Sequence, residues 1–185
     1  MKRFGAVILL VLFLSGCSGA ANEMNRSLML REKLQNGSCA FTAKVTADYG
    51  DKLYTFTLDC GADTQGNLSF TVQEPESISG ITGRITGTGG ALTFEDTALS
   101  FPLMADGQVT PVSAPWLLLK TLRSGFLSSA GMDGENLRLC MDDSYRDDAL
   151  HLDIWVNGEN LPVRAEILYS GRKILSLEVS SFTIS

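Results

Sequence analysis

From Cys39 onward, apolar and polar residues alternate along the chain, and this period of two is typical of half-buried β-strands. Residues 39–47 and 52–60 each carry apolar side chains at every second position. A four-residue loop, 48–51, lies between them and contains a glycine. The two segments therefore predict an antiparallel hairpin.

Closing this hairpin at residues 48–51 sets its register. The predicted pairs are Ala47 with Lys52, Val45 with Tyr54, Ala43 with Phe56, Phe41 with Leu58 and Cys39 with Cys60. The apolar side chains then meet on one face. This match supports the register, because a slip of one residue would turn each side chain to the opposite face.

Short strands continue to the end of the chain. They are expected at residues 67–73, 79–85, 91–95, 98–103, 137–141, 150–156, 162–169 and 174–182. Short strands at this spacing are typical of one meandering antiparallel sheet. Because two helices are also expected, the fold class is mainly β in an α+β arrangement.

The first helix is predicted at residues 23–35, before Gly37. Its apolar stripe consists of Met24, Leu28, Leu30 and Leu34. The second helix is expected between Ser113, a good N-cap residue, and Arg123. Apolar residues cover most of its circumference, so this helix must be buried on more than one side.

A second hairpin is predicted around the loop at residues 157–160. The expected pairs are Ile154 with Val163, Leu152 with Ala165, Asp153 with Arg164 and His151 with Glu166. Two pairs are apolar and two are of opposite charge. Both kinds of match stabilise an antiparallel pair.

The first 16 residues have the pattern of a signal peptide. Lys2 and Arg3 are followed by an apolar run, 6–14, which is too short to cross a bilayer, since about 20 residues are needed. The segment Leu-Ser-Gly-Cys that ends at Cys17 is similar to the lipobox of bacterial lipoproteins. That resemblance implies cleavage before Cys17 and acylation of its thiol. The alternative is an ordinary secretory signal that contains a cysteine.

The expected organisation is a signal peptide at 1–16, a tether at 17–22 and one domain at 23–185. The protein would then be extracytoplasmic and anchored to the cell membrane by lipid, at the outer membrane if the cell has one. Loss of Lys2 and Arg3 with the leader lowers the net charge of −6 by two units, to about −8. A chain this acidic is not expected to bind nucleic acid.

Three further cysteines follow Cys17. Exported proteins can keep disulfides, and the predicted register makes Cys39 and Cys60 the candidate pair. Cys140 is then left over, and a buried free thiol is the simplest interpretation of it. The chain has no Cys-x-x-Cys pattern, so neither a zinc site nor a thiol redox enzyme is expected.

No residue pattern indicates catalysis. His151 is the single histidine, no serine lies in a Gly-x-Ser-x-Gly elbow, and the glycines at 80–90 fit hairpin turns. Carboxylates at 142–148 could bind Ca²⁺, but their spacing is not that of an EF-hand and Arg146 interrupts them. A solvated turn is the preferred interpretation. We expect no enzyme, no cofactor and no metal site.

The order of a helix, a strand meander, an apolar helix and further strands resembles the LolA/LolB-like lipoprotein-carrier superfamily. The residues that carry the resemblance are Gly80-Ile81, Leu92-Thr93-Phe94, the run 111–119, Ile154-Trp155-Val156, Leu161-Pro162-Val163-Arg164 and Phe182. The resemblance implies an open half-barrel with its helices in the mouth and a hydrophobic cavity for acyl chains. Soluble carriers of this type diffuse between membranes, whereas an anchor at Cys17 favours a receptor, a stationary lipid handler or a relative adapted to envelope or spore assembly.

Two functions remain open at this stage. The first is the binding of acyl chains, of lipid or of a lipoprotein, in such a cavity. The second is an envelope or spore-assembly role, with a filled core and a protein partner. The residues expected to line the cavity are Phe41, Val45, Tyr54, Phe56, Leu58, Trp116, Leu119, Leu122, Leu152, Ile154, Val163 and Ile167.

Overall fold

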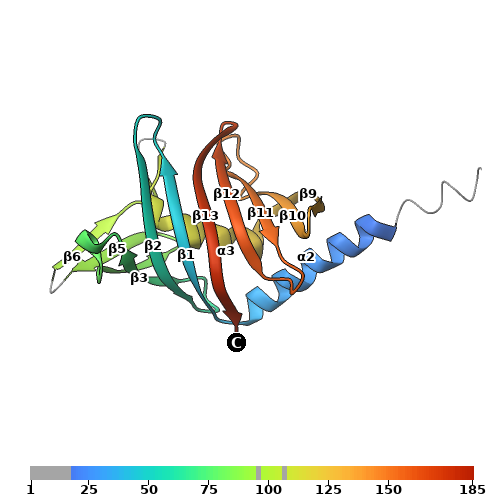
Figure 1. The fold of residues 1–185 in the computed structure, drawn as a ribbon, viewed down its shortest axis with the longest axis horizontal. Helices are drawn as coiled ribbons and strands as arrows, with labels where there is room; N and C mark the ends of the chain where they lie inside the picture. Colours follow the sequence, from blue (N-terminus) through green and yellow to red (C-terminus); the bar gives the residue numbers. More distant parts are fainter. Residues whose placement is uncertain (1–17, 95–96, 106–107) are drawn as a thin grey trace, which may run out of the picture.

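The computed structural model describes residues 18–94, 97–105 and 108–185. An 11-stranded antiparallel sheet curves around a central helix, and a second helix extends beyond the sheet (Figure 1). The helices are α2 (Ser18–Asn36) and α3 (Ala114–Ser124), with short 3-10 turns η1 (Glu76–Ile78) and η2 (Pro111–Ser113). The first strands are β1 (Cys39–Asp48), β2 (Leu53–Ala62), β3 (Leu68–Glu74), β4 (Thr82–Thr86), β5 (Gly89–Phe94) and β6 (Thr97–Phe101). The later strands are β9 (Phe126–Asp133), β10 (Asn136–Asp142), β11 (His151–Val156), β12 (Pro162–Tyr169) and β13 (Arg172–Ile184).

Neighbouring strands of the sheet are also consecutive strands in the sequence, except at its middle, where β1 pairs with β13. The strand order is β6-β5-β4-β3-β2-β1-β13-β12-β11-β10-β9, so the first and last strands join two meanders. A separate two-stranded ladder, β7 (Met104–Ala105) with β8 (Gln108–Val109), precedes α3. Since β6 and β9 are the two edges of the large sheet, it is open. The predicted fold class, a mainly β open sheet with two helices, is confirmed.

Helix α3 lies against the concave face of the sheet (Figure 1). Its buried residues are Ala114, Pro115, Trp116, Leu117, Leu118, Leu119, Thr121, Leu122 and Arg123. Its alanine, tryptophan and leucine side chains belong to one core cluster with the inner side chains of strands from both meanders. Burial around nearly the whole helix confirms what its continuous apolar sequence predicted.

Helix α2 begins at Ser18, five residues earlier than predicted, and therefore includes residues expected to form a tether. Leu30 and Leu34 are fully buried, as the predicted stripe requires. The prediction is wrong for Met24 and Leu28, which are 43% and 51% exposed. Figure 1 shows that the N-terminal part of α2 projects beyond the sheet.

The first hairpin forms with the predicted faces but not with the predicted register. Asp48 pairs with Leu53, Phe41 with Cys60, and Cys39 with Ala62, two residues away from the expected pairing. The four-residue loop lies at 49–52 instead of 48–51, and the Asp48 side chain accepts the backbone N–H of Gly50 at 2.8 Å. A shift of two keeps each side chain on its predicted face.

The second hairpin differs in the same way. Asp153 lies opposite Glu166 instead of Arg164, and His151 lies opposite Leu168 instead of Glu166. The register of the strand pair changes between Trp155 and Val156. The pairing therefore differs from that of a hairpin closed by a regular four-residue loop. The predicted charge pairs across the two strands are therefore wrong.

One strand of the large sheet was not predicted, nor was the small ladder of β7 and β8. Strand β9 pairs with β10 and forms an edge of the sheet. Its sequence, Phe-Leu-Ser-Ser-Ala-Gly-Met-Asp, does not alternate, and none of its residues is fully buried. An exposed edge strand has no buried face to impose a period of two, so the sequence signal is missing.

Candidate functional site

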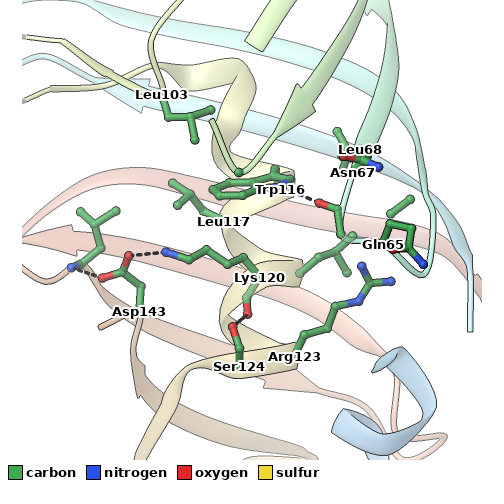
Figure 2. A pocket seen from close by; sticks show the side chains of 15 residues that line it. Gln65, Asn67, Leu68, Leu103, Trp116, Leu117, Lys120, Arg123, Ser124 and Asp143 are labelled. Atoms are coloured by element: carbon green, nitrogen blue, oxygen red, sulfur yellow. Dashed lines mark hydrogen bonds and ion pairs between the residues drawn. The ribbon is translucent and has the colours of Figure 1, made fainter. Parts of the chain in front are cut away.

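A pocket of about 460 Å³ lies beside Trp116, between α3 and the body of the sheet (Figure 2). Five parts of the chain line it: the turn between β2 and β3, the turn between β4 and β5, the segment that follows β6, helix α3, and the segment that follows β10. The apolar lining consists of Ala62, Leu68, Leu103, Trp116, Leu117, Leu119 and Leu150. The polar and small residues at its rim are Gln65, Gly66, Asn67, Gly87, Lys120, Arg123, Ser124 and Asp143.

The indole of Trp116 connects α3 to the turn between β2 and β3. Its Nε1–H donates to the carbonyl oxygen of Gly66 at 2.9 Å, and the residue is 7% exposed. Gly66 adopts a φ of 85°, a conformation that favours glycine and lets the turn present this carbonyl to the helix. The hydrogen bond fixes one wall of the pocket.

The same turn is held by the side chain of Asp63. Its carboxylate accepts the backbone N–H groups of Gln65 and Asn67, each at 2.9 Å, and the Asn67 Nδ2–H at 2.8 Å. The side-chain hydrogen bond from Asn67, with help from the two backbone bonds, lowers the pKa of Asp63. The wall that faces Trp116 is therefore a closed, hydrogen-bonded turn.

Opposite this turn, Lys120 and Asp143 form an ion pair at the rim. Lys120 Nζ lies 3.0 Å from Asp143 Oδ2 and 5.7 Å from the centre of the Trp116 ring. The other Asp143 oxygen accepts the backbone N–H of Leu150 at 2.9 Å. Figure 2 shows both of these contacts at the side of the pocket. The rim charges are thus compensated within the protein.

Arg123 closes the C-terminal end of the site. This residue is 9% exposed, and its Nε–H donates to the carbonyl oxygen of Leu34 at 2.8 Å. A second nitrogen donates to the carbonyl oxygen of Gly37 at 3.3 Å. Both acceptors lie at the end of α2, where helix carbonyls lack intrahelical partners.

The interaction between the helices is reciprocal. Arg31 of α2 donates to the carbonyl oxygens of Leu122 at 3.0 Å and Gly125 at 2.6 Å. Gln35 donates to the Arg123 carbonyl oxygen at 2.7 Å. Each helix therefore supplies donors for the C-terminal carbonyls of the other, and this contact positions α3 in the concave face.

Only two of the residues expected to line a cavity, Trp116 and Leu119, line this pocket. Most of the others are packed in the core: Phe41, Val45, Leu58, Leu122, Leu152, Ile154 and Ile167. Phe56 and Val163 are half-buried, and Tyr54 is 43% exposed. Helix α3 fills most of the concavity, and the pocket remains at one side, where it meets the turn between β2 and β3.

The predicted cysteine pair is not formed, and Cys39, Cys60 and Cys140 are free. Because the first hairpin is shifted by two, Cys39 lies opposite Ala62 and is a diagonal neighbour of Cys60. Burial is the main cause that raises the pKa of both thiols. Cys140 is half-buried rather than buried, on the outer face of β10.

The acidic segment at 142–148 uses its carboxylates in separate contacts. Asp142 Oδ1 lies 2.8 Å from His151 Nδ1, while Asp143 pairs with Lys120. Asp148 Oδ1 lies 2.9 Å from Arg146 Nε in the exposed part of the turn. His151 is thus paired with Asp142, not with Glu166 as the sequence register predicted.

The predicted signal peptide at 1–16 and the predicted lipidation site, Cys17, lie outside the described residues. Within residues 18–94, 97–105 and 108–185, no helix has the length and apolar character needed to cross a bilayer.

Comparison with known proteins yields similarity at the level of structure. No family model matches the sequence, and no curated protein matches it. An uncharacterized conserved protein from Thermus thermophilus is 14% identical, with 90% of this chain and 87% of that chain aligned at a TM-score of 0.48. The lipoprotein LppX of Mycobacterium tuberculosis is also 14% identical, with coverage of 87% and 93% and a TM-score of 0.42.

A LolA superfamily protein from Nitrosomonas europaea is 11% identical, with 85% of this chain and 92% of that chain aligned at a TM-score of 0.43. LolA-superfamily structures are among those that this chain resembles. Identities and TM-scores of this size carry no inference about ligand or activity, which must come from the geometry of the site.

Proposed function

We propose that this chain is an extracytoplasmic lipoprotein, anchored through Cys17, that holds an acyl chain of a lipid or of another lipoprotein. The pocket beside Trp116 is the observation that carries the proposal. Its volume of about 460 Å³ lies within the range of roughly 300–1,000 Å³ that is typical of small-molecule sites. Leucine side chains and an indole supply most of its lining, and such a surface suits a hydrocarbon ligand.

The energetics of an acyl chain fit this site. Each methylene transferred from water to an apolar surface contributes about 0.8 kcal/mol, so several methylenes suffice without any charged contact. The nearby charges are already compensated, since Lys120 pairs with Asp143 and Arg123 donates to the end of α2. These satisfied groups favour binding over acid–base chemistry, and we propose that the protein is not an enzyme.

Membrane attachment is consistent with the position of α2. The helix begins at Ser18, directly after the proposed acylated Cys17, and leads to the body of the domain without a long linker. Detergent partitioning of the native protein tests this part of the proposal. Wild-type chain should enter the detergent phase, while Cys17→Ala chain should be released or keep its leader. Recovery of the wild-type chain in the aqueous phase would contradict the anchor.

Titration with a fluorescent fatty acid tests the pocket. Gln65 and Ser124 are exposed at its rim, so Gln65→Trp and Ser124→Trp should obstruct entry while they leave the core unchanged. Thr55→Trp, on an exposed position of β2, is the matched control. We expect both rim variants to weaken binding at least about tenfold, which corresponds to 1.4 kcal/mol, and the control to bind as wild type does.

A second function is favoured by one feature of the core. The side chains of Val45, Leu58 and Ile154, which were expected to line a wide cavity, are fully buried in the core cluster. A filled core supports an envelope or spore-assembly protein that recognises another protein. Failure of the folded wild-type chain to bind any fatty acid would favour this alternative.

A further inference from the structure

A group of metal-binding residue types lies on the outer face of the sheet, on strands β10 and β11. Cys140 pairs directly with Asp153, and Asp142 pairs with His151 two positions along, which is the next pair on the same face. The inner side chains of β10, such as Leu139, pack in the core on the opposite face. The four outer residues therefore form a square of two adjacent cross-strand pairs, away from the pocket.

The donor atoms of Cys140, His151 and Asp153 converge. The Cys140 sulfur, an imidazole nitrogen and an Asp153 oxygen all lie within 4.8 Å of one another. His151 Nε2 lies 3.6 Å from Asp153 Oδ1. One ion placed among these atoms could reach all three after small side-chain movements, since metal bonds to sulfur and nitrogen are about 2.0–2.3 Å long.

The orientation of His151 favours this use of its ring. Its Nδ1 lies 2.8 Å from Asp142 Oδ1. An ionised carboxylate can only accept a hydrogen bond, so Asp142 holds a proton on Nδ1 and leaves Nε2, on the Asp153 side of the ring, as the nitrogen that would bind an ion. A carboxylate behind the imidazole is the usual support of a metal-binding histidine, because it fixes the tautomer and the ring orientation.

Asp153 is also held in place. Its side chain is 8% exposed, and Arg138 donates to both oxygens, from Nε at 3.2 Å and from the second nitrogen at 2.7 Å. Each carboxylate oxygen has a further lone pair, so these hydrogen bonds leave acceptor positions for an ion. Metal-ligating carboxylates are commonly hydrogen-bonded in this way.

We propose that Cys140, His151 and Asp153 bind one transition-metal ion of the Zn²⁺ type, with Asp142 and Arg138 as positioning residues. A thiolate and an imidazole select such an ion over Ca²⁺ or Mg²⁺, which prefer oxygen ligands. Binding releases the Cys140 thiol proton to solvent and leaves a fourth coordination position open. His151, whose side chain is 37% exposed, gives the ion a path from solvent.

Cobalt titration of the full chain in detergent, under a non-chelating reductant, tests the proposal. One equivalent of Co²⁺ should produce a thiolate-to-cobalt charge-transfer band, and Zn²⁺ should displace it. Cys140→Ser should abolish the band, whereas Cys60→Ser, which removes a buried thiol outside the cluster, should keep it. Asp142→Asn should keep the band but weaken affinity roughly 10- to 100-fold.

A second measurement uses the wild-type chain alone. His151 is the single histidine, so its ring protons give one identifiable set of NMR signals. One equivalent of Zn²⁺ should shift or broaden that set. Unchanged histidine signals, or a cobalt band that survives in Cys140→Ser, would overturn the proposal. Neither result depends on whether the pocket beside Trp116 binds lipid.

Discussion

Arg123 donates its Nε–H to the carbonyl oxygen of Leu34 at 2.8 Å, and so a buried guanidinium of α3 satisfies the C-terminal end of α2. Arg31 and Gln35 of α2 return the contact to the end of α3. The last carbonyls of a helix lack intrahelical partners, so each helix supplies what the other lacks. These hydrogen bonds fix α3 in the position where its Trp116 side lines the pocket.

Removal of this guanidinium should destabilise the fold. In Arg123→Met the aliphatic stem still packs, but the carbonyl oxygens of Leu34 and Gly37 lose their donors. Unpaired buried polar groups cost about 1–3 kcal/mol each, so urea unfolding should show a loss of about that size. Arg172→Met, at an exposed position, should change the free energy of unfolding by less than about 0.5 kcal/mol. Equal stability of the two variants would contradict the role of Arg123.

A glycine on β4 should be intolerant of a side chain. Gly83 pairs with Phe70 of β3, and a Cβ built on Gly83 would lie 2.3 Å from Phe70 Cζ. Phe70 is 2% exposed, so its ring cannot move away freely. Gly83→Ala should therefore lower the free energy of unfolding by about 1–3 kcal/mol, as overpacking does.

The matched control is Gly131→Ala on β9, where a Cβ would meet no atom within 4 Å. Thermal unfolding of the two variants gives the comparison. A Gly83→Ala protein that melts with the control would show that the Phe70 ring is not held against the glycine.

The faces of the strands could be predicted from the sequence, but their register could not. Alternation assigns Phe41 and Leu58 to the core face, and both are buried there. A shift of two residues keeps the same faces, so apolar matching does not distinguish pairing of Ala47 with Lys52 from pairing with Tyr54. The observed turn depends on Asp48, whose side chain accepts from Gly50.

The pocket could not be predicted from strand patterns, because five separate parts of the chain line it. Trp116 and Leu119 could be assigned in advance, since an apolar helix must face the interior. The contribution of the turn at Gly66 and of Asp143 follows from tertiary contacts alone. The candidate metal ligands on the outer face, Cys140, His151 and Asp153, could not be recognised from the sequence for a related reason. The pairing of β10 with β11 brings Cys140 and His151 together.

The free thiols give a third prediction. Burial raises the pKa of Cys39, Cys60 and Cys140, so access decides which thiol reacts: Cys39 and Cys60 are 4% and 5% exposed, whereas Cys140 is half-buried. At pH 8, N-ethylmaleimide should modify the half-buried Cys140 in the native chain and reach Cys60 only after unfolding. Peptide mass spectrometry identifies the modified sites. A disulfide-linked peptide containing Cys39 and Cys60 would contradict the free-thiol arrangement.

The ion pair between Arg138 and Asp153 predicts a pH dependence. Burial by itself raises the pKa of Asp153, but the hydrogen bonds from Arg138 and Cys140 outweigh it, and the pKa lies below the ordinary 3.8. A carboxyl whose folded pKa is depressed stabilises the fold above its unfolded pKa. That stability is lost as the pH falls through the lower folded value.

Arg138→Met should therefore cost on the order of 1 kcal/mol at pH 7, because its half-exposed guanidinium is partly screened. The difference from wild type should shrink as the pH falls below 3.8. Urea unfolding at several pH values measures it. Arg146→Met removes an exposed ion pair with Asp148 and should show little effect at any pH. A cost for Arg138→Met that is independent of pH would contradict the assignment.

The central claim is that the pocket beside Trp116 holds an acyl chain. Its most direct test is native mass spectrometry of the full chain, purified from its own cell envelope in mild detergent. We predict a bound lipid or acylated species on the wild-type and Thr55→Trp chains, and its loss from Gln65→Trp and Ser124→Trp. A folded wild-type chain without any bound acyl species, or equal occupancy in all four proteins, would contradict the claim.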